Sequence, residues 1–270
     1  MSATAAITSA LAASLPTRFF DRLSRSRERV LLLDYDGTIA PFSSNRERAF
    51  PYPTVPELLD CIMSTCQTHV ALISGRAARE VPPLLGMTPH PEIWGTSGIE
   101  RLDADDRYSV AELSHDTEQA LAEAQDALRH HGLDALCELK PGAVAVHWRS
   151  LSRSRMEEVR AKAYHAFSPF TGTHQLLLSQ FDGGMELRLR TRNKGDVVRA
   201  MLASYDPAVP IAYLGDDNTD EDAFRALNKS GLTVLVRPTC RFTAAQVWLQ
   251  PPNELIQFLE KWVQACGGEM

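Results

Sequence analysis

The segment Val30–Thr38 reads VLLLDYDGT, in which four aliphatic residues are followed directly by two acids and a glycine. A short apolar run that ends this sharply predicts a strand buried on both faces, as in a parallel sheet. Ligands of open α/β sheets bind beyond the carboxyl ends of the strands, so Asp34 and Asp36 are expected at the mouth of a ligand site. An isolated D-x-D-G is more often a simple turn, and the interpretation therefore depends on what else reaches this edge.

Two further runs have the same form. Val70–Ile73 precedes SGR, and Ile211–Leu214 precedes GDDNTDEDAF. Strands alternating with helices predict a Rossmann-like α/β core with a parallel sheet and right-handed crossovers. The expected helices are Thr54–Gln67, Arg76–Leu85 (with Pro82 and Pro83 as breakers), Lys194–Ser204 and Asn253–Ala265, and a last strand is expected at Thr233–Arg237.

The middle of the chain has a different order of expected strands and helices, which predicts a smaller α/β domain inserted into the core. Its β-α-β-β-α-β order suggests an independent sheet with helices on one side. We expect the core to comprise residues 1–106 and 190–270 and the inserted domain residues 107–189. The expected elements are a strand at Tyr108–Glu112, a helix at His115–His131, a hairpin of Leu136–Lys140 and Ala143–Trp148, a helix from Ser152 to about Phe167, and a hairpin of Gln175–Ser179 and Met185–Leu189 around Asp182–Gly184.

The composition excludes several classes of protein. The chain has 270 residues and a net charge of −6, so no basic field favours nucleic acid or an anionic membrane as a partner. No apolar run reaches the roughly 18 residues of a membrane-spanning helix. The five cysteines are scattered, which indicates neither a disulfide framework nor a zinc site. Residues 1–16 contain no basic residue, so a short helix is expected there and not a signal peptide. We therefore expect the protein to be cytoplasmic.

A second acidic cluster, Asp216–Asp222, follows the strand Ile211–Leu214. Alone it could be a solvated loop leading into a helix, whose first turn favours acids. Two such clusters at one sheet edge would repel each other unless a cation lay between them, and oxygen ligands without nearby His or Cys indicate Mg²⁺. The expected ligands are Asp34, Asp216 and the backbone carbonyl of Asp36, and Asp217 and Asp220 are expected just outside the ligand set.

These residues are suited to phosphoryl transfer. Asp34 can attack phosphorus, while Asp36 can protonate the leaving oxygen and later accept a proton from water. Ser74 and Gly75 can offer a hydroxyl and backbone amides to phosphate oxygens, and Lys194 can stabilise developing negative charge. An isolated SGR is more often a turn and an isolated KG more often surface, so the set is informative through its order around the two acidic clusters.

The segments DYDGT, SGR, NKG and GDDNTDED together resemble, in this order, the four motifs of the haloacid dehalogenase superfamily. In that superfamily an acid two positions after the nucleophile distinguishes phosphatases and phosphomutases, so the resemblance implies phosphoryl transfer through Asp34 and Asp36. An insertion between the second and third motifs resembles the C2 type of cap.

Within the superfamily, the chain is most similar to the trehalose-6-phosphate phosphatases, through LDYDGTIAPF, GDDNTDEDAF, Glu138-x-Lys140, AVHWR at 145–149 and MELR at 185–188. The resemblance implies Mg²⁺-dependent hydrolysis of trehalose 6-phosphate to trehalose and phosphate, with a trehalose-6-phosphate synthase as a candidate partner. The side chains expected to contact the sugar are Arg76, Glu138, Lys140, His147, Arg149 and Glu186. Without the family context, these would be interpreted as a solvated strand face.

Two segments depart from the family pattern. Ser97 stands where a His is usual, and Arg190–Arg192 stands where an R-P-x-G sequence is commoner. Both positions are expected beside the sugar. Three alternatives therefore remain at this stage: a phosphatase for another sugar phosphate such as sucrose or glucosylglycerate phosphate, a sugar phosphomutase, and a non-catalytic sugar-phosphate sensor.

Overall fold

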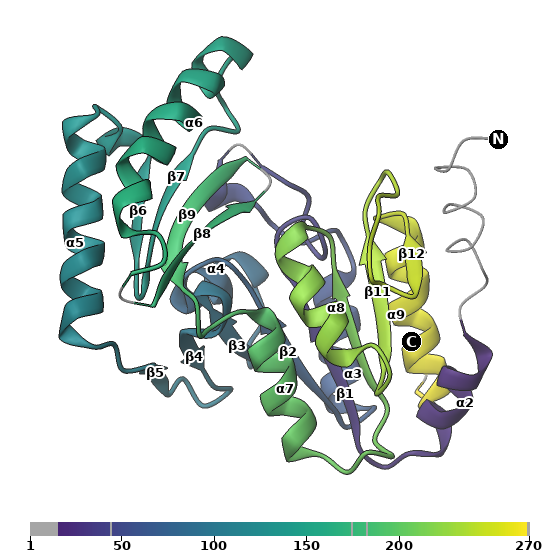
Figure 1. The fold of residues 1–270 in the computed structure, drawn as a ribbon. Helices are drawn as coiled ribbons and strands as arrows, with labels where there is room; N and C mark the ends of the chain where they lie inside the picture. The colour runs from purple at the N-terminus through teal and green to yellow at the C-terminus, as the bar shows by residue number, and fades with distance from the viewer. Residues whose placement is uncertain (1–15, 44, 174, 182, 269–270) are drawn as a thin grey trace.

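The computed structural model describes residues 16–43, 45–173, 175–181 and 183–268, which form two separate β-sheets with their helices (Figure 1). The short helix expected in the N-terminal segment and Asp182 of the second expected hairpin lie outside these ranges. All five cysteines are free thiols. No helix within the described ranges is long and apolar enough to cross a membrane.

The larger sheet has eight strands in the order β12-β11-β10-β1-β2-β3-β4-β5. The strands from β12 to β3 are parallel, and β4 and β5 are antiparallel to their neighbours. Their bounds are β1 Arg29–Leu33, β2 Thr68–Ile73, β3 Glu92–Gly95, β4 Glu100–Leu102, β5 Tyr108–Val110, β10 Ile211–Gly215, β11 Leu232–Val236 and β12 Val247–Leu249.

Helices cover both faces of this sheet, so the core has three layers (Figure 1). The helices are α2 Thr17–Arg25, α3 Val55–Ser64, α4 Val81–Leu85 and α9 Asn253–Ala265 on one face, and α7 Lys194–Ser204 and α8 Glu221–Leu227 on the other. Strand β1 supplies alternate residues to the two apolar layers: Leu31 and Leu33 to one, Val30 and Leu32 to the other. Burial on both faces explains why the strand is aliphatic at all four positions after Arg29.

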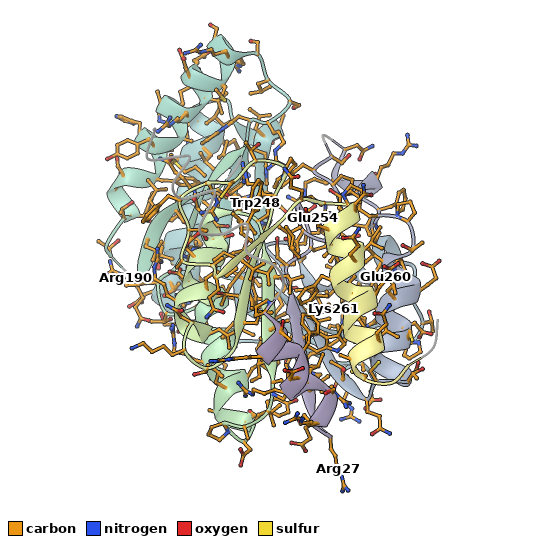
Figure 2. All side chains as sticks on the ribbon, turned by 90° about the vertical axis from the view of Figure 1, so that its right-hand side faces the viewer. Arg27, Arg190, Trp248, Glu254, Glu260 and Lys261 are labelled. Carbon is orange, nitrogen blue, oxygen red and sulfur yellow. The ribbon has the colours of Figure 1, made fainter. Side chains whose placement is uncertain are left out.

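Helix α9 closes one side of the core. Its apolar stripe includes Phe258 and Trp262, which are buried against α2 and α3. Figure 2 shows this helix from its outer side, where it carries Glu254, Glu260 and Lys261. The spacing of three to four residues between buried positions is the pattern that predicted this helix with its observed bounds.

The smaller sheet has four strands in the order β6-β7-β9-β8, all antiparallel. Its elements are α5 His115–His130, β6 Cys137–Lys140, β7 Ala143–His147, α6 Arg153–Phe167, β8 Leu176–Phe181 and β9 Gly184–Leu189. Both helices pack on the sheet through one apolar cluster. Ser152 caps α6 as expected, because its side chain accepts a hydrogen bond from the backbone N–H of Arg155.

Two sequence predictions are wrong. The strand expected at Tyr108–Glu112 was assigned to the inserted sheet, but β5 pairs with β4 at the edge of the larger sheet. Pro82 and Pro83 do not break a helix; they lie in the first turn of α4, where a missing backbone N–H costs nothing. The expected helix at 76–85 is instead divided into a 3₁₀ turn, Ala78–Glu80, and α4.

The register of the central strands determines where the polar segments meet. Leu33 of β1 is paired with Leu214 of β10 on one side and with Leu72 of β2 on the other. The three strands therefore end at the same level, and the segments that begin at Asp34, Ser74 and Asp216 emerge side by side at one edge of the sheet.

Candidate active site

Asp34 lies directly after β1, and its side chain is almost fully buried. Its backbone N–H donates to the carbonyl of Leu214 at 2.8 Å, which ties the residue to the neighbouring strand. Oδ1 accepts a hydrogen bond from Nζ of Lys194 at 2.6 Å, and Oδ2 accepts one from Oγ1 of Thr38 at 3.3 Å. Burial raises the pKa of Asp34 to about 7, although Lys194 lowers it.

Lys194 is the first residue of α7, where it is held by an N-terminal capping box between Asn193 and Asp196. Its buried ammonium also donates to Oδ1 of Asp220 at 2.8 Å. Burial alone would lower the pKa of Lys194, but Asp220 and Asp34 raise it above its ordinary value. Lys194 is therefore a permanent positive charge beside Asp34.

Asp220 makes hydrogen bonds through both of its carboxylate oxygens. Oδ1 accepts from Lys194 and from the hydroxyl of Tyr213 at 2.5 Å. Oδ2 accepts from the backbone N–H groups of Asp216 and Asp217 at 3.0 and 2.9 Å. Asp220 therefore has a structural role, because its hydrogen bonds orient Lys194 and the loop that carries Asp216.

Asp216 has the opposite environment. Both of its carboxylate oxygens are buried, and neither has a hydrogen-bond partner among the described residues. The guanidinium of Arg237 is 3.8 Å from Oδ2, beyond hydrogen-bonding distance. Burial raises the pKa of Asp216 well above its ordinary value, and the neighbouring charges of Asp34 and Asp220 raise it further.

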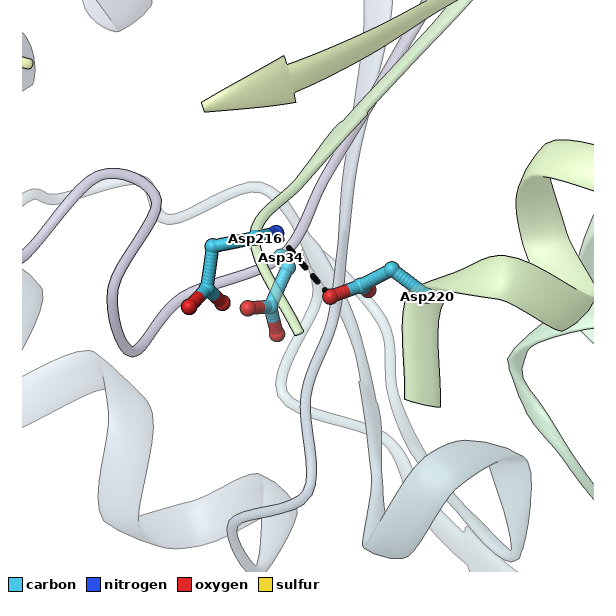
Figure 3. A group of neighbouring side chains, drawn as sticks. All are labelled: Asp34, Asp216 and Asp220. Carbon is cyan, nitrogen blue, oxygen red and sulfur yellow. Dashed lines mark hydrogen bonds between the residues drawn. The ribbon is translucent and has the colours of Figure 1, made fainter. Parts of the chain in front are cut away.

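The three acids Asp34, Asp216 and Asp220 converge closely enough that one oxygen of each lies within 4.8 Å of the others (Figure 3). A buried carboxylate without a partner is costly unless a cation or a proton satisfies it. Since the donors are all oxygens and two of the acids have oxygens to offer, the site fits a hard divalent cation such as Mg²⁺.

Asp36 and Arg76 form a bidentate ion pair at the same edge. Nε and Nη2 of Arg76 donate to the two carboxylate oxygens of Asp36, each at 2.7 Å. The guanidinium of Arg76 is almost fully buried, and its Nη1 donates to the backbone carbonyl of Arg46 at 3.0 Å. Arg76 was expected to contact the sugar, but its hydrogen bonds are directed to these protein groups.

The segment after β2 lies beside this pair. Oγ of the buried Ser74 accepts a hydrogen bond from the backbone N–H of Arg76 at 3.1 Å. Gly75 lines the cavity described below, and a Cβ at this position would meet no atom within 4 Å. The carbonyl of Gly75 accepts a hydrogen bond from Nζ of Lys140 at 2.8 Å. One residue of the inserted unit therefore reaches the core directly.

A cavity of about 180 Å³ lies between the two sheets. Most of the predicted residues line it: Asp34, Asp36, Gly75, Arg76, Lys194, Asp216 and Asp217 from the core, and Lys140, His147, Arg149 and Glu186 from the insert. Ser97, one of the departures from the family pattern, lines it as well. Glu138 instead lines an adjoining groove of about 620 Å³ that shares Arg46, Arg76 and His147 with the cavity.

Sequence reasoning missed several residues of this cavity, of which Phe42 and Arg46 make the clearest contacts. The ring of Phe42 packs under the guanidinium of Arg149, whose Cζ is 4.1 Å from the ring centroid. Arg46 forms ion pairs with Glu138 of the insert and Glu80 of the core. Both residues lie between β1 and α3, in a segment whose apolar residues do not repeat at the spacing of a helix or a strand. Only the ten-residue likeness LDYDGTIAPF, which ends at Phe42, could have drawn attention to that position.

Comparison with known proteins agrees with this geometry. The sequence profile of the trehalose-phosphatase family matches residues 32–246. A probable trehalose-phosphate phosphatase H of Arabidopsis thaliana is 28% identical, with 90% of this chain and 74% of that protein covered. A trehalose-phosphate phosphatase of Mycobacterium bovis is 29% identical, and the match covers 87% of this chain and 61% of that protein.

The fold has a close counterpart among solved structures. The C-terminal domain of Candida albicans trehalose-6-phosphate phosphatase superposes with a TM-score of 0.79, covering 96% of this chain and 99% of that one at 20% identity. This likeness confirms the predicted fold class, a parallel-sheet core with a smaller inserted α/β unit. Since the family profile spans most of the sequence and both sheets, the chain belongs to the trehalose-phosphatase family.

Proposed function

We propose that this protein is a phosphatase that hydrolyses trehalose 6-phosphate to trehalose and inorganic phosphate. The observation that carries the proposal is the pairing of Asp34 with Lys194 beside the unpartnered carboxylate of Asp216, in a cavity that also receives charged side chains of the insert. Membership of the trehalose-phosphatase family supports the choice of substrate.

In the proposed reaction, a carboxylate oxygen of Asp34 attacks phosphorus and the bond from phosphorus to the sugar oxygen breaks. Asp36 protonates the departing oxygen, which leaves as the trehalose hydroxyl. Water then attacks the phosphoryl group on Asp34, Asp36 takes its proton, and inorganic phosphate is released. Lys194 keeps Asp34 in place and neutralises part of the negative charge that gathers there.

Mg²⁺ fits the carboxylates of Asp34 and Asp216, which converge with Asp220 so that one oxygen of each lies within 4.8 Å of the others. The backbone carbonyl of Asp36 remains our predicted third donor. Once bound, the ion would supply the positive charge that lets an anionic carboxylate approach an anionic phosphate. Asp220 was expected just outside the ligand set, and its saturated hydrogen bonds support that expectation. The positive charge of the bound ion would let the site attract an anionic substrate, although the net charge of the chain is −6.

We infer that the inserted unit acts as a cap that binds the sugar and excludes water. Lys140, His147, Arg149 and Glu186 face the cavity, and charged groups of this kind form several directional hydrogen bonds to sugar hydroxyls. Because β5 belongs to the core sheet, we place the start of the cap at α5. The hydrogen bond from Lys140 to Gly75 joins the cap to the core.

Another sugar phosphate is the second candidate substrate, because Ser97 lines the cavity at a position where the family usually has His. The test is phosphate release, with and without Mg²⁺, from trehalose 6-phosphate, sucrose 6-phosphate and glucose 6-phosphate. We expect trehalose 6-phosphate to give the highest kcat/KM, and no release without Mg²⁺. Higher kcat/KM for another ester would reassign the substrate, and binding without release would favour a sensor.

The source of the substrate follows from its chemistry. A trehalose phosphate can be supplied by an enzyme that joins two sugars with the phosphate in place, and we propose a trehalose-6-phosphate synthase as the enzyme that acts before this one.

The backbone at Gly37 provides a first test of the proposed Mg²⁺ site. Gly37 has a φ of +88°, and a Cβ there would lie 2.4 Å from Oδ2 of Asp216. Gly37→Ala is therefore expected to displace Asp216 and to lower phosphate release at least a hundredfold, with a higher requirement for Mg²⁺. The measurement is the rate of phosphate release as a function of Mg²⁺ concentration.

Gly86→Ala is the matched control, because Gly86 has a φ of +68° but a Cβ there would meet nothing within 4 Å. It carries the conformational penalty of about 1–2 kcal/mol for a Cβ at positive φ without the collision. Equal Mg²⁺ requirements in the two variants would show that Gly37 matters only through backbone strain.

A further inference from the structure

Arg46 occupies a junction between the core and the cap that the proposed chemistry does not use. It begins a 3₁₀ turn, Arg46–Arg48, in the core segment between β1 and α3. Its Nη1 donates a short hydrogen bond to Oε2 of Glu138 on β6 and lies 3.1 Å from Nε2 of His147 on β7. Its Nη2 is 3.5 Å from Oε2 of Glu80, and the side chain lines both the cavity and the adjoining groove.

Glu138 is held asymmetrically. Three groups that carry or can carry positive charge approach one oxygen, Oε2: Arg46, His147 at 2.6 Å and Lys140 at 3.3 Å. The other oxygen, Oε1, has no hydrogen bond to any described residue. Burial alone would raise the pKa of Glu138, but the hydrogen bond with His147 and the charges of Lys140 and Arg46 hold it below its usual range.

An ionised carboxylate with one oxygen fully engaged and the other available is a good acceptor for a hydroxyl group. Glu138 lines the groove that adjoins the cavity, and the groove contains none of the acids of the proposed phosphate end. We infer that Arg46 is a positioning residue for sugar recognition: it fixes Glu138 through Oε2, so that Oε1 is presented to a hydroxyl of the substrate. This inference rests on the proposed function.

The side chain of Arg46 can be changed without breaking the contact that links this turn to the phosphate end. Arg76, which holds Asp36, donates to the backbone carbonyl of Arg46 and not to its side chain. A substitution at 46 retains that carbonyl. The inference therefore predicts a loss that depends on the sugar part of the substrate, whereas general damage to the site would affect every phosphate ester.

The test compares trehalose 6-phosphate with p-nitrophenyl phosphate, a phosphate ester without a sugar. Losing a charge-assisted hydrogen bond changes binding on the order of ten- to a hundredfold. Arg46→Gln is expected to raise KM for trehalose 6-phosphate by that factor, with kcat changed less than KM. Its kcat/KM should fall at least ten times more for trehalose 6-phosphate than for p-nitrophenyl phosphate, and Arg46→Lys should recover part of the loss.

Two further variants complete the experiment. Arg48→Gln is the matched control, because Arg48 belongs to the same turn and is exposed, and it should retain wild-type KM. If Arg46 acts through Glu138, then adding Arg46→Gln to Glu138→Gln should lower kcat/KM for trehalose 6-phosphate less than threefold further.

Equal losses for both substrates, or fully additive losses in the double variant, would overturn the inference. Failure of the wild-type protein to hydrolyse trehalose 6-phosphate would instead refute the proposed function. In that case the Arg46 comparison is repeated with the sugar phosphate that the wild-type protein prefers, where the same outcomes decide it.

Discussion

Replacing Asp34 with Asn is expected to abolish phosphate release from trehalose 6-phosphate while the protein remains folded. The amide has the shape of the carboxylate and its oxygen can still accept the hydrogen bond from Lys194. It cannot, however, form the bond to phosphorus that the reaction requires. We expect kcat to fall by about 10⁴-fold or more, which corresponds to ~5 kcal/mol of transition-state stabilisation.

The measurement is phosphate release under single-turnover and steady-state conditions, with thermal unfolding as the control for folding. Deamidation of the new side chain would restore the nucleophile, so the mass of the variant protein is checked before each assay. The wild-type protein should also incorporate phosphate from labelled substrate in an acid-stable form, and the variant should not. Turnover within tenfold of the wild type would show that a different residue attacks phosphorus.

Much of the core could be predicted from the sequence because each signal was local. The strand before Asp34 is aliphatic from Val30 to Leu33, since both faces of β1 are covered by helices. Helices α7 and α9 begin and end where the spacing of apolar residues and the flanking residues predicted. The meeting of Asp34, Asp216 and Lys194 then follows from one rule about parallel sheets.

The remaining features depended on contacts between distant segments. The edge strand β5 is short and mostly exposed, so nothing in its own sequence distinguishes a place in the core sheet from one in the cap. The pairing of Arg76 with Asp36 joins two loops, and neither loop indicates it. Arg46 is one of two arginines in the polar stretch 43–48, and only the folded cap reveals that it reaches Glu138.

Asp216→Asn is the second variant with a large expected effect, because it should change activity and stability in opposite directions. In the folded protein without Mg²⁺, three buried acids share one buried ammonium, that of Lys194. The carboxylate of Asp216 has no hydrogen-bond partner among the residues of the described ranges. A neutral amide at this place is less costly to bury than a charge that no hydrogen bond satisfies and that lies 3.8 Å from the guanidinium of Arg237.

The pH dependence follows from the direction of the pKa shifts. Burial raises the pKa of Asp34 to about 7 and that of Asp216 well above its ordinary value, whereas both are near 3.8 when unfolded. A carboxyl group whose pKa is raised by folding contributes most below its unfolded pKa, and that contribution is lost as the pH rises through the folded pKa. Without Mg²⁺, the wild-type protein should therefore lose stability between about pH 4 and pH 7.

Asp216→Asn removes one of these groups, so in the presence of a chelator the variant should unfold at a higher temperature than the wild type at pH 7.5. An unsatisfied buried group costs on the order of 1–3 kcal/mol, and each kcal/mol corresponds to about 2–4 °C in a chain of this size. The difference should shrink towards pH 4, where the wild-type acids are protonated. Asp222→Asn is the matched control, since Asp222 belongs to the same acidic segment but is partly exposed and pairs with Arg225.

Adding Mg²⁺ should reverse the order of the two proteins. Binding to the folded state alone stabilises the wild type, and the variant has lost one of the ligands that would hold the ion. The same loss should lower phosphate release about 10³-fold, because less positive charge would then stand between Asp34 and the phosphate. If the variant were more stable than the wild type with Mg²⁺ as well as without it, Asp216 would not be a ligand, and the unpartnered carboxylate at this edge would need a different explanation.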